Sequence, residues 1–109
     1  MTQDPSPARL IWTDGTTPRS AQFDDIYFSP TDGLGEAEHV FVSGSDLDTR
    51  FQTAQRFTIG ELGFGTGLNF LAARRAWRRN RPAGSHLHYI AVEGFPLARN
   101  DLARALSAW

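Results

Sequence analysis

A glycine-rich turn between two acidic residues is the part of this chain whose residue types could do chemistry. Gly63, Gly65 and Gly67 stand at every second position after an apolar run that contains Glu61. Backbone without Cβ atoms lets a ligand approach closely, and a helix start offers unpaired N–H groups and partial positive charge. Glu93 closes the next apolar run. The pattern predicts a nucleotide-like cofactor at the carboxyl ends of two neighbouring parallel strands.

The spacing of the glycines separates one class of cofactor from others. A dinucleotide fingerprint needs a third glycine where this chain has Leu68, and the absence of Gly-Lys-Ser/Thr excludes a P-loop. The acid-first pattern E-x-G-x-G-x-G instead resembles the S-adenosyl-L-methionine loop of Rossmann-like, class I methyltransferases. The resemblance implies that the amino-acid end of the cofactor is surrounded by Glu61, Gly63, Phe64, Gly65, Thr66 and Gly67. It also implies that Glu93 binds the two ribose hydroxyls, which a carboxylate can accept. A dinucleotide site and a purely structural turn remain as alternatives.

Four elements must position these residues. The apolar patterning predicts a βαβα unit, with strands at 57–62 and 87–93 and helices at about 66–80 and 96–107. Pro96 suits the first turn of the last helix. The expected fold class is α/β.

The first half of the chain has weaker signals. Asp14-Gly15 predicts the turn of a hairpin over about 9–23, and Pro18 limits its own segment to an edge strand or irregular chain. Residues 32–35 are expected to be irregular, and 36–42 fit a helix or a strand equally well. Ser45, with Asp48 three residues later, predicts the start of a short helix that runs through Phe51.

Several stretches around the glycine turn resemble the methyltransferase half of the bacterial MnmC family. These stretches are 22–29, 33–34, 39–41, 60–71 and 93–97. That family makes 5-methylaminomethyl-2-thiouridine at the wobble position of tRNA. The resemblance implies N-methylation of 5-aminomethyl-(2-thio)uridine, with S-adenosyl-L-methionine as cofactor and tRNA as partner. It implies a Rossmann-like domain of which the chain holds the N-terminal portion only, a β-hairpin plus the first βαβα unit.

The resemblance is incomplete in two respects. The family's later acidic segment, near the transferred methyl group, has no counterpart, and neither has the flavin-dependent oxidoreductase half of the bifunctional members. We therefore expect residues 1–9 to be disordered, 10–109 to be an incomplete methyltransferase domain, and activity of the chain alone to be low. A rival interpretation is a truncated chain that binds the cofactor or a partner without catalysis. An unpaired sheet edge would then favour self-association.

Three residues before the first predicted strand of the βαβα unit are further candidates. Tyr27 could line the cofactor pocket, and Asp24 or Asp25 could hold the substrate amine and accept a proton. These two acids are weak candidates for catalysis. The alternative is structural: the apolar residues of this segment form core while the acids face solvent, the apolar residues being Phe23, Ile26 and Phe28.

Arginines are concentrated in the second part of the chain. Residues 49–109 hold nine Arg and three acidic residues, whereas 1–48 hold two Arg and nine acidic residues. Five of these cations lie on the first predicted helix of the βαβα unit or just beyond it: Arg74, Arg75, Arg78, Arg79 and Arg81. They could attract tRNA phosphates. A solvated helix face is favoured, because the active site is expected at the other end of this helix.

Composition limits the remaining classes of function. The chain has 109 residues, a net charge of −1 and no cysteine, so it holds at most one domain and no thiolate metal site. There is no signal pattern and no apolar run of membrane-spanning length, and a cytoplasmic protein without a membrane partner is expected. His39, His86 and His88 lack metal-ligand spacing, so no metal is predicted. Trp12, Trp77 and Trp109 are expected in the core or at an interface with missing parts, with base stacking as the less favoured alternative.

Overall fold

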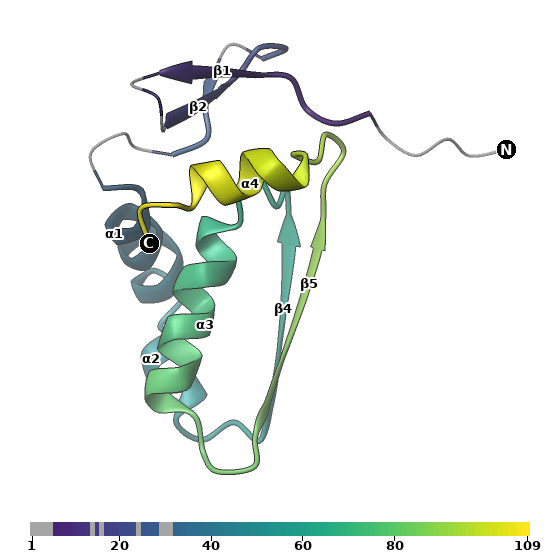
Figure 1. Ribbon diagram of the computed structural model, residues 1–109. Helices are drawn as coiled ribbons and strands as arrows, with labels where there is room; N and C mark the ends of the chain where they lie inside the picture. Colours follow the sequence, from purple (N-terminus) through teal and green to yellow (C-terminus); the bar gives the residue numbers. More distant parts are fainter. Residues whose placement is uncertain (1–5, 14, 16, 24, 29–31) are drawn as a thin grey trace, which may run out of the picture.

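The centre of the fold is a parallel two-stranded sheet with a helix crossing between its strands (Figure 1). A computed structural model describes residues 6–13, 15, 17–23, 25–28 and 32–109. β4 (Arg56–Leu62) pairs in parallel with β5 (His86–Val92), and α3 (Leu68–Asn80) connects them. The register runs from Arg56 opposite His86 to Leu62 opposite Val92, so both strands end at the same edge. The predicted βαβ arrangement is confirmed.

All the helices that build the core lie on one face of this sheet. α1 (Gly33–Ala37), a π-helical turn η1 (Glu38–Ser43) and α2 (Leu47–Phe51) pack against α3. Residues of β4 alternate between the covered and the bare face, as a half-buried strand requires. The buried apolar cluster contains Leu34, Ala37, Val42, Leu47, Phe51, Ile59, Leu68, Ala72, Ala73, Ala76 and Trp77. The predicted core position of Trp77 is confirmed.

The opposite face of the parallel sheet has no covering layer among the described residues. Leu62 is 90% exposed there, and Ile90 and Val92 are more than half exposed. His86 and His88 lie on the same bare face. A parallel sheet is normally covered on both faces, so this bare face is where the described fold departs most from an ordinary parallel sheet.

A small antiparallel sheet lies above the carboxyl ends of the parallel strands (Figure 1). β1 (Leu10–Thr13) and β2 (Thr17–Ser20) form the predicted hairpin, and β3 (Asp25–Ile26) pairs with β2. The edge-strand prediction for Pro18 is wrong, because β2 is the central strand. β3 pairs only with Arg19 and Ser20, so the missing N–H of Pro18 removes no bond from that ladder.

The segment expected to be irregular at 32–35 is instead the start of a helix. The Asp32 side chain accepts a hydrogen bond from the Gly35 N–H and caps α1, a signal that the glycines obscured. The undecided segment 36–42 is helical. The helix through Phe51 is confirmed, but Ser45 does not cap it; Asp46, in the left-handed region, takes the N-cap position.

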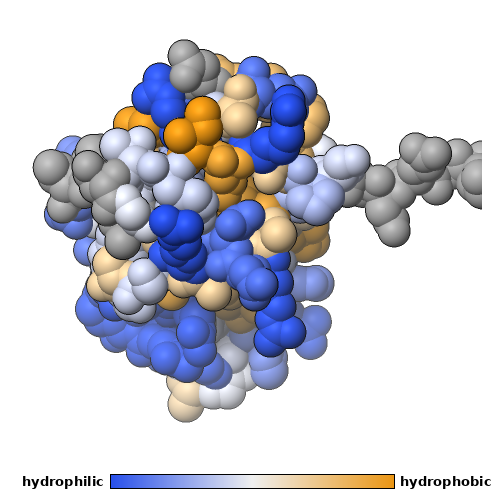
Figure 2. Space-filling model, turned by 45° about the horizontal axis from the view of Figure 1, so that its top comes forward, coloured by the Kyte–Doolittle hydropathy of each residue, from blue (hydrophilic) through white to orange (hydrophobic). Residues whose placement is uncertain are grey.

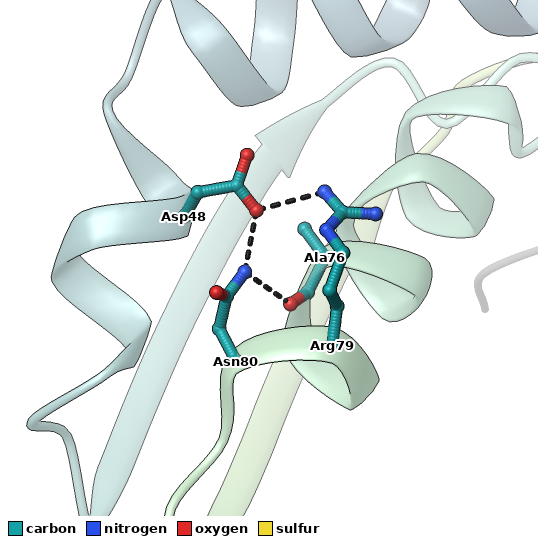
Figure 3. Close-up of polar contacts among 4 residues, drawn as sticks. All are labelled: Asp48, Ala76, Arg79 and Asn80. Carbon is teal, nitrogen blue, oxygen red and sulfur yellow. Dashed lines mark hydrogen bonds and ion pairs between the residues drawn. The ribbon is translucent and has the colours of Figure 1, made fainter.

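The Asp48 side chain links α2 to the end of α3 instead of capping its own helix. Its Oδ1 accepts hydrogen bonds from the Arg79 guanidinium, at 2.7 Å, and from the Asn80 amide (Figure 3). The same Asn80 amide also donates to the Ala76 carbonyl of α3. These bonds fix the last turn of α3 against α2.

α4 (Arg99–Ala105) crosses above the parallel sheet (Figure 1). It begins three residues after Pro96, so the prediction that Pro96 lies in its first turn is wrong; Ala98 is the N-cap. The Arg104 guanidinium lies 4.0 Å from the Trp12 ring centre and donates to the Gly15 carbonyl, which ties α4 to the hairpin. Trp109 packs edge-on against Phe28. In the first nine residues, 1–5 lie outside the described residues, and the Ala8 N–H donates to the Pro96 carbonyl.

Candidate functional site

The three glycines of the turn after β4 adopt a backbone that other residues rarely reach. Gly63, Gly65 and Gly67 have φ of 83°, 59° and 86°, all in the left-handed region. A Cβ on Gly67 would lie 2.8 Å from the Phe64 ring, whereas a Cβ on Gly63 would meet no atom within 4 Å. Gly67 is therefore needed for packing, and Gly63 leaves open space beside the backbone.

Glu93, at the end of β5, holds the glycine turn in place. Its Oε1 accepts from the Gly65 N–H at 2.8 Å, and its Oε2 accepts from the Phe95 N–H at 3.0 Å. The Gly63 N–H donates to the Val92 carbonyl at 2.8 Å, which continues the pairing of the strands into the turn. A carboxylate oxygen can accept more than one hydrogen bond, so Glu93 keeps capacity for a ligand.

The Glu61 side chain contacts the first turn of α3, which follows the glycine turn. Its Oε2 accepts from the Asn69 side-chain amide of α3 at 2.8 Å. Its Oε1 and the Tyr89 hydroxyl are buried, and neither makes a hydrogen bond to the described residues. Burial, followed by the nearby Glu61 carboxylate, raises the pKa of Tyr89 well above its usual value. Glu61 thus anchors the first turn of α3.

A cavity of about 290 Å³ opens between the glycine turn and the α1–η1 segment. Gly63, Gly65 and Thr66 line it from the turn, and Tyr27 lines it from the segment after β3. The remaining lining residues are Phe28, Gly33, Glu36, Ala37, Val40, Phe64, Leu68 and Asn69. The start of α3 borders this cavity, and no side chain caps that helix end, so its partial positive charge favours an anionic ligand group there.

A second cavity, of about 270 Å³, lies on the other side of Tyr27. It is lined by Glu93, the Tyr27 ring and an aromatic and apolar set: Ser20, Phe23, Asp25, Ile26 and Phe95. Phe23 and Phe95 pack edge to face, with ring centres 5.1 Å apart. Figure 2 shows apolar surface between hydrophilic areas on this upper side of the molecule.

The tyrosine shared by the two cavities has an altered acidity. Burial, followed by the negative charge of Glu93, raises the pKa of Tyr27, and the Ser20 hydroxyl partly offsets this. The phenol therefore stays neutral at neutral pH and can donate a hydrogen bond. A ligand that spans both cavities would therefore contact Tyr27.

The structure brings most of the predicted site residues together and separates two of them. Gly63, Phe64, Gly65, Thr66 and Tyr27 share the first cavity, and Glu93 lines the second. Gly67, buried at the start of α3, and Glu61 line neither cavity.

The structural alternative for the acidic and aromatic segment 23–28 is only partly correct. Asp25 is exposed and lines the second cavity, while its Oδ1 accepts from the Ile26 N–H; Asp24 lies outside the described residues. The alternative that placed Phe23 and Ile26 in the core is wrong, because Phe23 is 59% exposed and Ile26 45%. Only Phe28 packs against the buried cluster.

Sequence reasoning missed Asn69 and Glu36. Asn69 follows the third glycine by two residues, and an amide at the first turn of a helix, eight residues after an acid, is a usable signal once the turn is known. Glu36 could not be placed because its segment fitted a helix or a strand. Both residues line the first cavity.

Two other kinds of site find no support within the described ranges. No three His, Cys, Asp or Glu side chains among these residues lie close enough to hold a metal ion. No helix in the described part of the chain is long and apolar enough to cross a membrane.

Known proteins match the chain over nearly its whole length. The tRNA 5-methylaminomethyl-2-thiouridine biosynthesis bifunctional protein MnmC of Pseudomonas fluorescens is 49% identical over 105 residues, 94% of this chain. The same protein of Methylobacillus flagellatus is 50% identical over 106 residues, and that of Caulobacter vibrioides 44% over 104 residues. The chain is a homologue of the MnmC proteins. It spans 16–18% of the length of these three MnmC relatives, and no protein-family model matches it.

A solved structure supports the fold. The crystal structure of MnmC2 from Aquifex aeolicus aligns with 96% of this chain and 37% of its own, with a TM-score of 0.61 and 21% identity. The likeness bears on the fold alone: an α/β domain with parallel strands, consistent with the Rossmann-like class that the sequence predicts.

Proposed function

We propose that the chain binds S-adenosyl-L-methionine at the glycine turn and serves methyl transfer to the amine of 5-aminomethyl-(2-thio)uridine at the tRNA wobble position. The observation that carries the proposal is the Glu93 carboxylate on the Gly65 N–H, with a cavity on each side of Tyr27. An elongated ligand with an anionic end and a ribose fits that arrangement. The names of the MnmC relatives support tRNA modification as the process.

The residues present fit the cofactor. Gly63 leaves room beside the backbone, and the uncapped start of α3 would hold the carboxylate of the amino-acid end. Phe64, Thr66 and Tyr27 would line the same end. Glu93 would accept the ribose hydroxyls with the capacity that its two backbone contacts leave. Gly67 and Glu61 would act through the turn, Glu61 by fixing Asn69.

The chemistry that the cofactor supplies when bound is an electrophilic methyl group on a sulfonium. The acceptor amine must be neutral to attack it, and the main contribution of the protein is to hold the two reactants in line. Asp25 faces the second cavity, where its carboxylate could orient an amine or accept its proton. Asp24 remains a proposal of the same kind.

Binding rather than turnover tests this proposal. Isothermal titration of the chain with S-adenosylhomocysteine should give a saturable signal, and NAD and FAD should give none. Glu93→Ala removes the contacts to Gly65 and Phe95 and should weaken binding about tenfold or more. Asp101→Asn, an acid of α4 outside both cavities, is the control. Binding of NAD in place of S-adenosylhomocysteine would support a dinucleotide oxidoreductase instead.

Partners and location follow from the same proposal. tRNA is the proposed substrate, a flavin-dependent oxidoreductase half the proposed neighbour in the bifunctional relatives, and the cytoplasm the proposed location. The bare sheet face and the outer edge of β4, which pairs with no strand among the described residues, support the rival proposal of self-association without catalysis. A concentration series in analytical ultracentrifugation, combined with the titration above, separates the two proposals.

A further inference from the structure

A groove of about 370 Å³ runs along α3 on the side of the β5 start. Three arginines line it, Arg74, Arg78 and Arg81; His86, whose side chain lies on the bare sheet face, borders it at the start of β5. Phe70, Trp77, Ser85 and Leu87 complete the lining. The arginines recur at the spacing that places residues on one side of a helix, so a row of cations follows the groove.

Two of these cations have no counter-charge in the described part of the chain. No carboxylate there pairs with Arg74 or Arg78, and α3 contains no acidic residue. Arg79, by contrast, is held by Asp48 on the side of α2 (Figure 3). Of the five arginines, Arg74 and Arg78 therefore face the groove without a carboxylate partner, whereas the charge of Arg79 is already paired.

Arg81 is fixed in position at the end of the groove. Its guanidinium donates to the Ser85 hydroxyl and carbonyl, and it lies 5.8 Å from the Trp77 ring centre. A guanidinium held in this way loses little freedom when it binds an anion. Arg81 keeps further N–H groups for a ligand, since a guanidinium has five donors.

The floor of the groove indicates whether a nucleic acid would be bound by base stacking or by its phosphates. The Trp77 ring is packed edge-on against Phe51, and the residue is 4% exposed. A ring so covered offers no face on which a base could stack. The groove thus offers charged N–H donors at its rim, which suit phosphate oxygens.

We propose that the groove lined by Arg74, Arg78 and Arg81 binds the phosphate backbone of RNA. The inference rests on the proposed function, in which the substrate is a tRNA. α3 has 13 residues and so is about 20 Å long, which places the groove beside the glycine turn rather than in it. An enzyme that acts on one nucleotide needs such contacts to hold neighbouring nucleotides, so the proposal takes the phosphate-binding alternative for these arginines in preference to a solvated helix face.

Fluorescence anisotropy with labelled, unmodified tRNA tests this proposal. The double variant Arg74→Gln/Arg78→Gln should weaken binding about tenfold and lower the slope of log affinity against log salt by about 1.4 to 1.8, the value for two lost phosphate contacts. Arg75→Gln, on the same helix but outside the groove, should change affinity less than about twofold. Circular dichroism must show each variant folded as the parent chain is.

Three results would overturn the groove proposal. One is an equal loss of affinity in Arg75→Gln, and another is no tRNA binding by the parent chain even at low salt. The third is competition by anionic phospholipid vesicles, which would indicate a membrane surface as the occupant. Titration of the parent chain and of the double variant with S-adenosylhomocysteine keeps the two proposals apart. If the parent chain does not bind S-adenosylhomocysteine, the cofactor proposal fails. If the double variant loses affinity for tRNA alone, the groove proposal is still supported.

Discussion

The two ends of α3 use different parts of the chain to meet a ligand. At its start, beside the glycine turn, the backbone itself is exposed, and the carboxylates of Glu61 and Glu93 hold it in shape. At its end, the groove presents side chains, the arginines at 74, 78 and 81, over a closed core. A rigid backbone cradle can select a small molecule by shape, whereas long cationic side chains suit a polymer of repeating charge.

Charge follows the same division along the helix. Cations near a helix C-terminus are favoured by the helix dipole, and an uncapped N-terminus favours anionic groups of a ligand. One helix can therefore hold an anionic group of a cofactor at one end and a polyanion along its other end. Mutations that affect one end and spare the other test this division.

The largest effect should come from the core that both ends share. Trp77→Ala removes a ring that packs against Phe51 and forms the floor of the groove. We expect it to lower the free energy of unfolding by about 3–5 kcal/mol, and both cofactor and tRNA binding should fail together. Urea denaturation measures the loss. Ile90→Ala, on the bare face, is the control and should have a much smaller effect; similar losses in the two variants would place the stabilising core elsewhere.

A substitution of Gly67 should impair ligand binding at the start of α3 and leave the groove at its end unaffected. Gly67→Ala puts a Cβ at φ 86°, 2.8 Å from the Phe64 ring, and we expect a loss of about 1–3 kcal/mol in stability. Affinity for S-adenosylhomocysteine should fall at least about tenfold, while tRNA anisotropy should be unchanged in folded protein.

Gly84→Ala provides the matched control for that variant. Gly84 has φ 71°, but a Cβ there meets nothing within 4 Å. It should show the backbone strain without the collision and without loss of cofactor binding. If both variants lose the cofactor equally, then the shape of the turn is not what holds it.

Alkaline pH should also distinguish the two ends. The chain has two tyrosines and neither lysine nor cysteine, so tyrosines are the side chains that titrate between about pH 9 and 11. Both have a raised pKa in the folded chain. The unfolded chain therefore loses these protons first, and stability is full below pH 10 and falls above it.

Tyr89→Phe should flatten that fall more than Tyr27→Phe, because Tyr89 has the larger upward shift in pKa. Melting temperatures between pH 8 and 11 measure the difference. A profile unchanged in Tyr89→Phe would mean that neither burial nor the Glu61 carboxylate raises the pKa of Tyr89 in the folded chain. Arginine stays charged throughout this range, so the groove should keep its charge.

The smallest effect should come from the link between α2 and the end of α3. Asp48→Asn removes the carboxylate that Arg79 and Asn80 share, but both ionic partners are about half exposed. We expect a loss below about 1 kcal/mol. The freed Arg79 adds a cation near the groove, so tRNA should bind slightly more tightly at low salt. Weaker tRNA binding in this variant would show that Asp48 shapes the groove.

Local patterns predicted the elements around the glycine turn, and longer-range contacts decided the rest. Alternating apolar residues and three glycines were sufficient for β4, α3 and β5. The helix start at Asp32 was hidden by two glycines, which a capping side chain stabilised in the helix. Pro18 fits a central strand only because β3 is two residues long. No local sequence pattern predicts so short a strand.

The candidate site shows the same limit. Spacing identified the turn residues and Glu93, but the orientation of Glu61 depends on Asn69 across the turn. Tyr27 was a candidate by position alone, and its place between two cavities follows from the packing of the hairpin above the sheet. The groove could not be predicted from the sequence, because it forms where β5 lies beside α3. The periodicity of a helix does not show which element packs against it.

The hydrogen bond from the Ala8 amide to the Pro96 carbonyl, at 2.8 Å, joins the beginning of the described chain to the segment directly after Glu93. A ligand that stiffens this segment should slow deuterium exchange at the Ala8 amide. A single proton remote in sequence from the glycines would then report occupancy, readable by NMR without any label on the ligand.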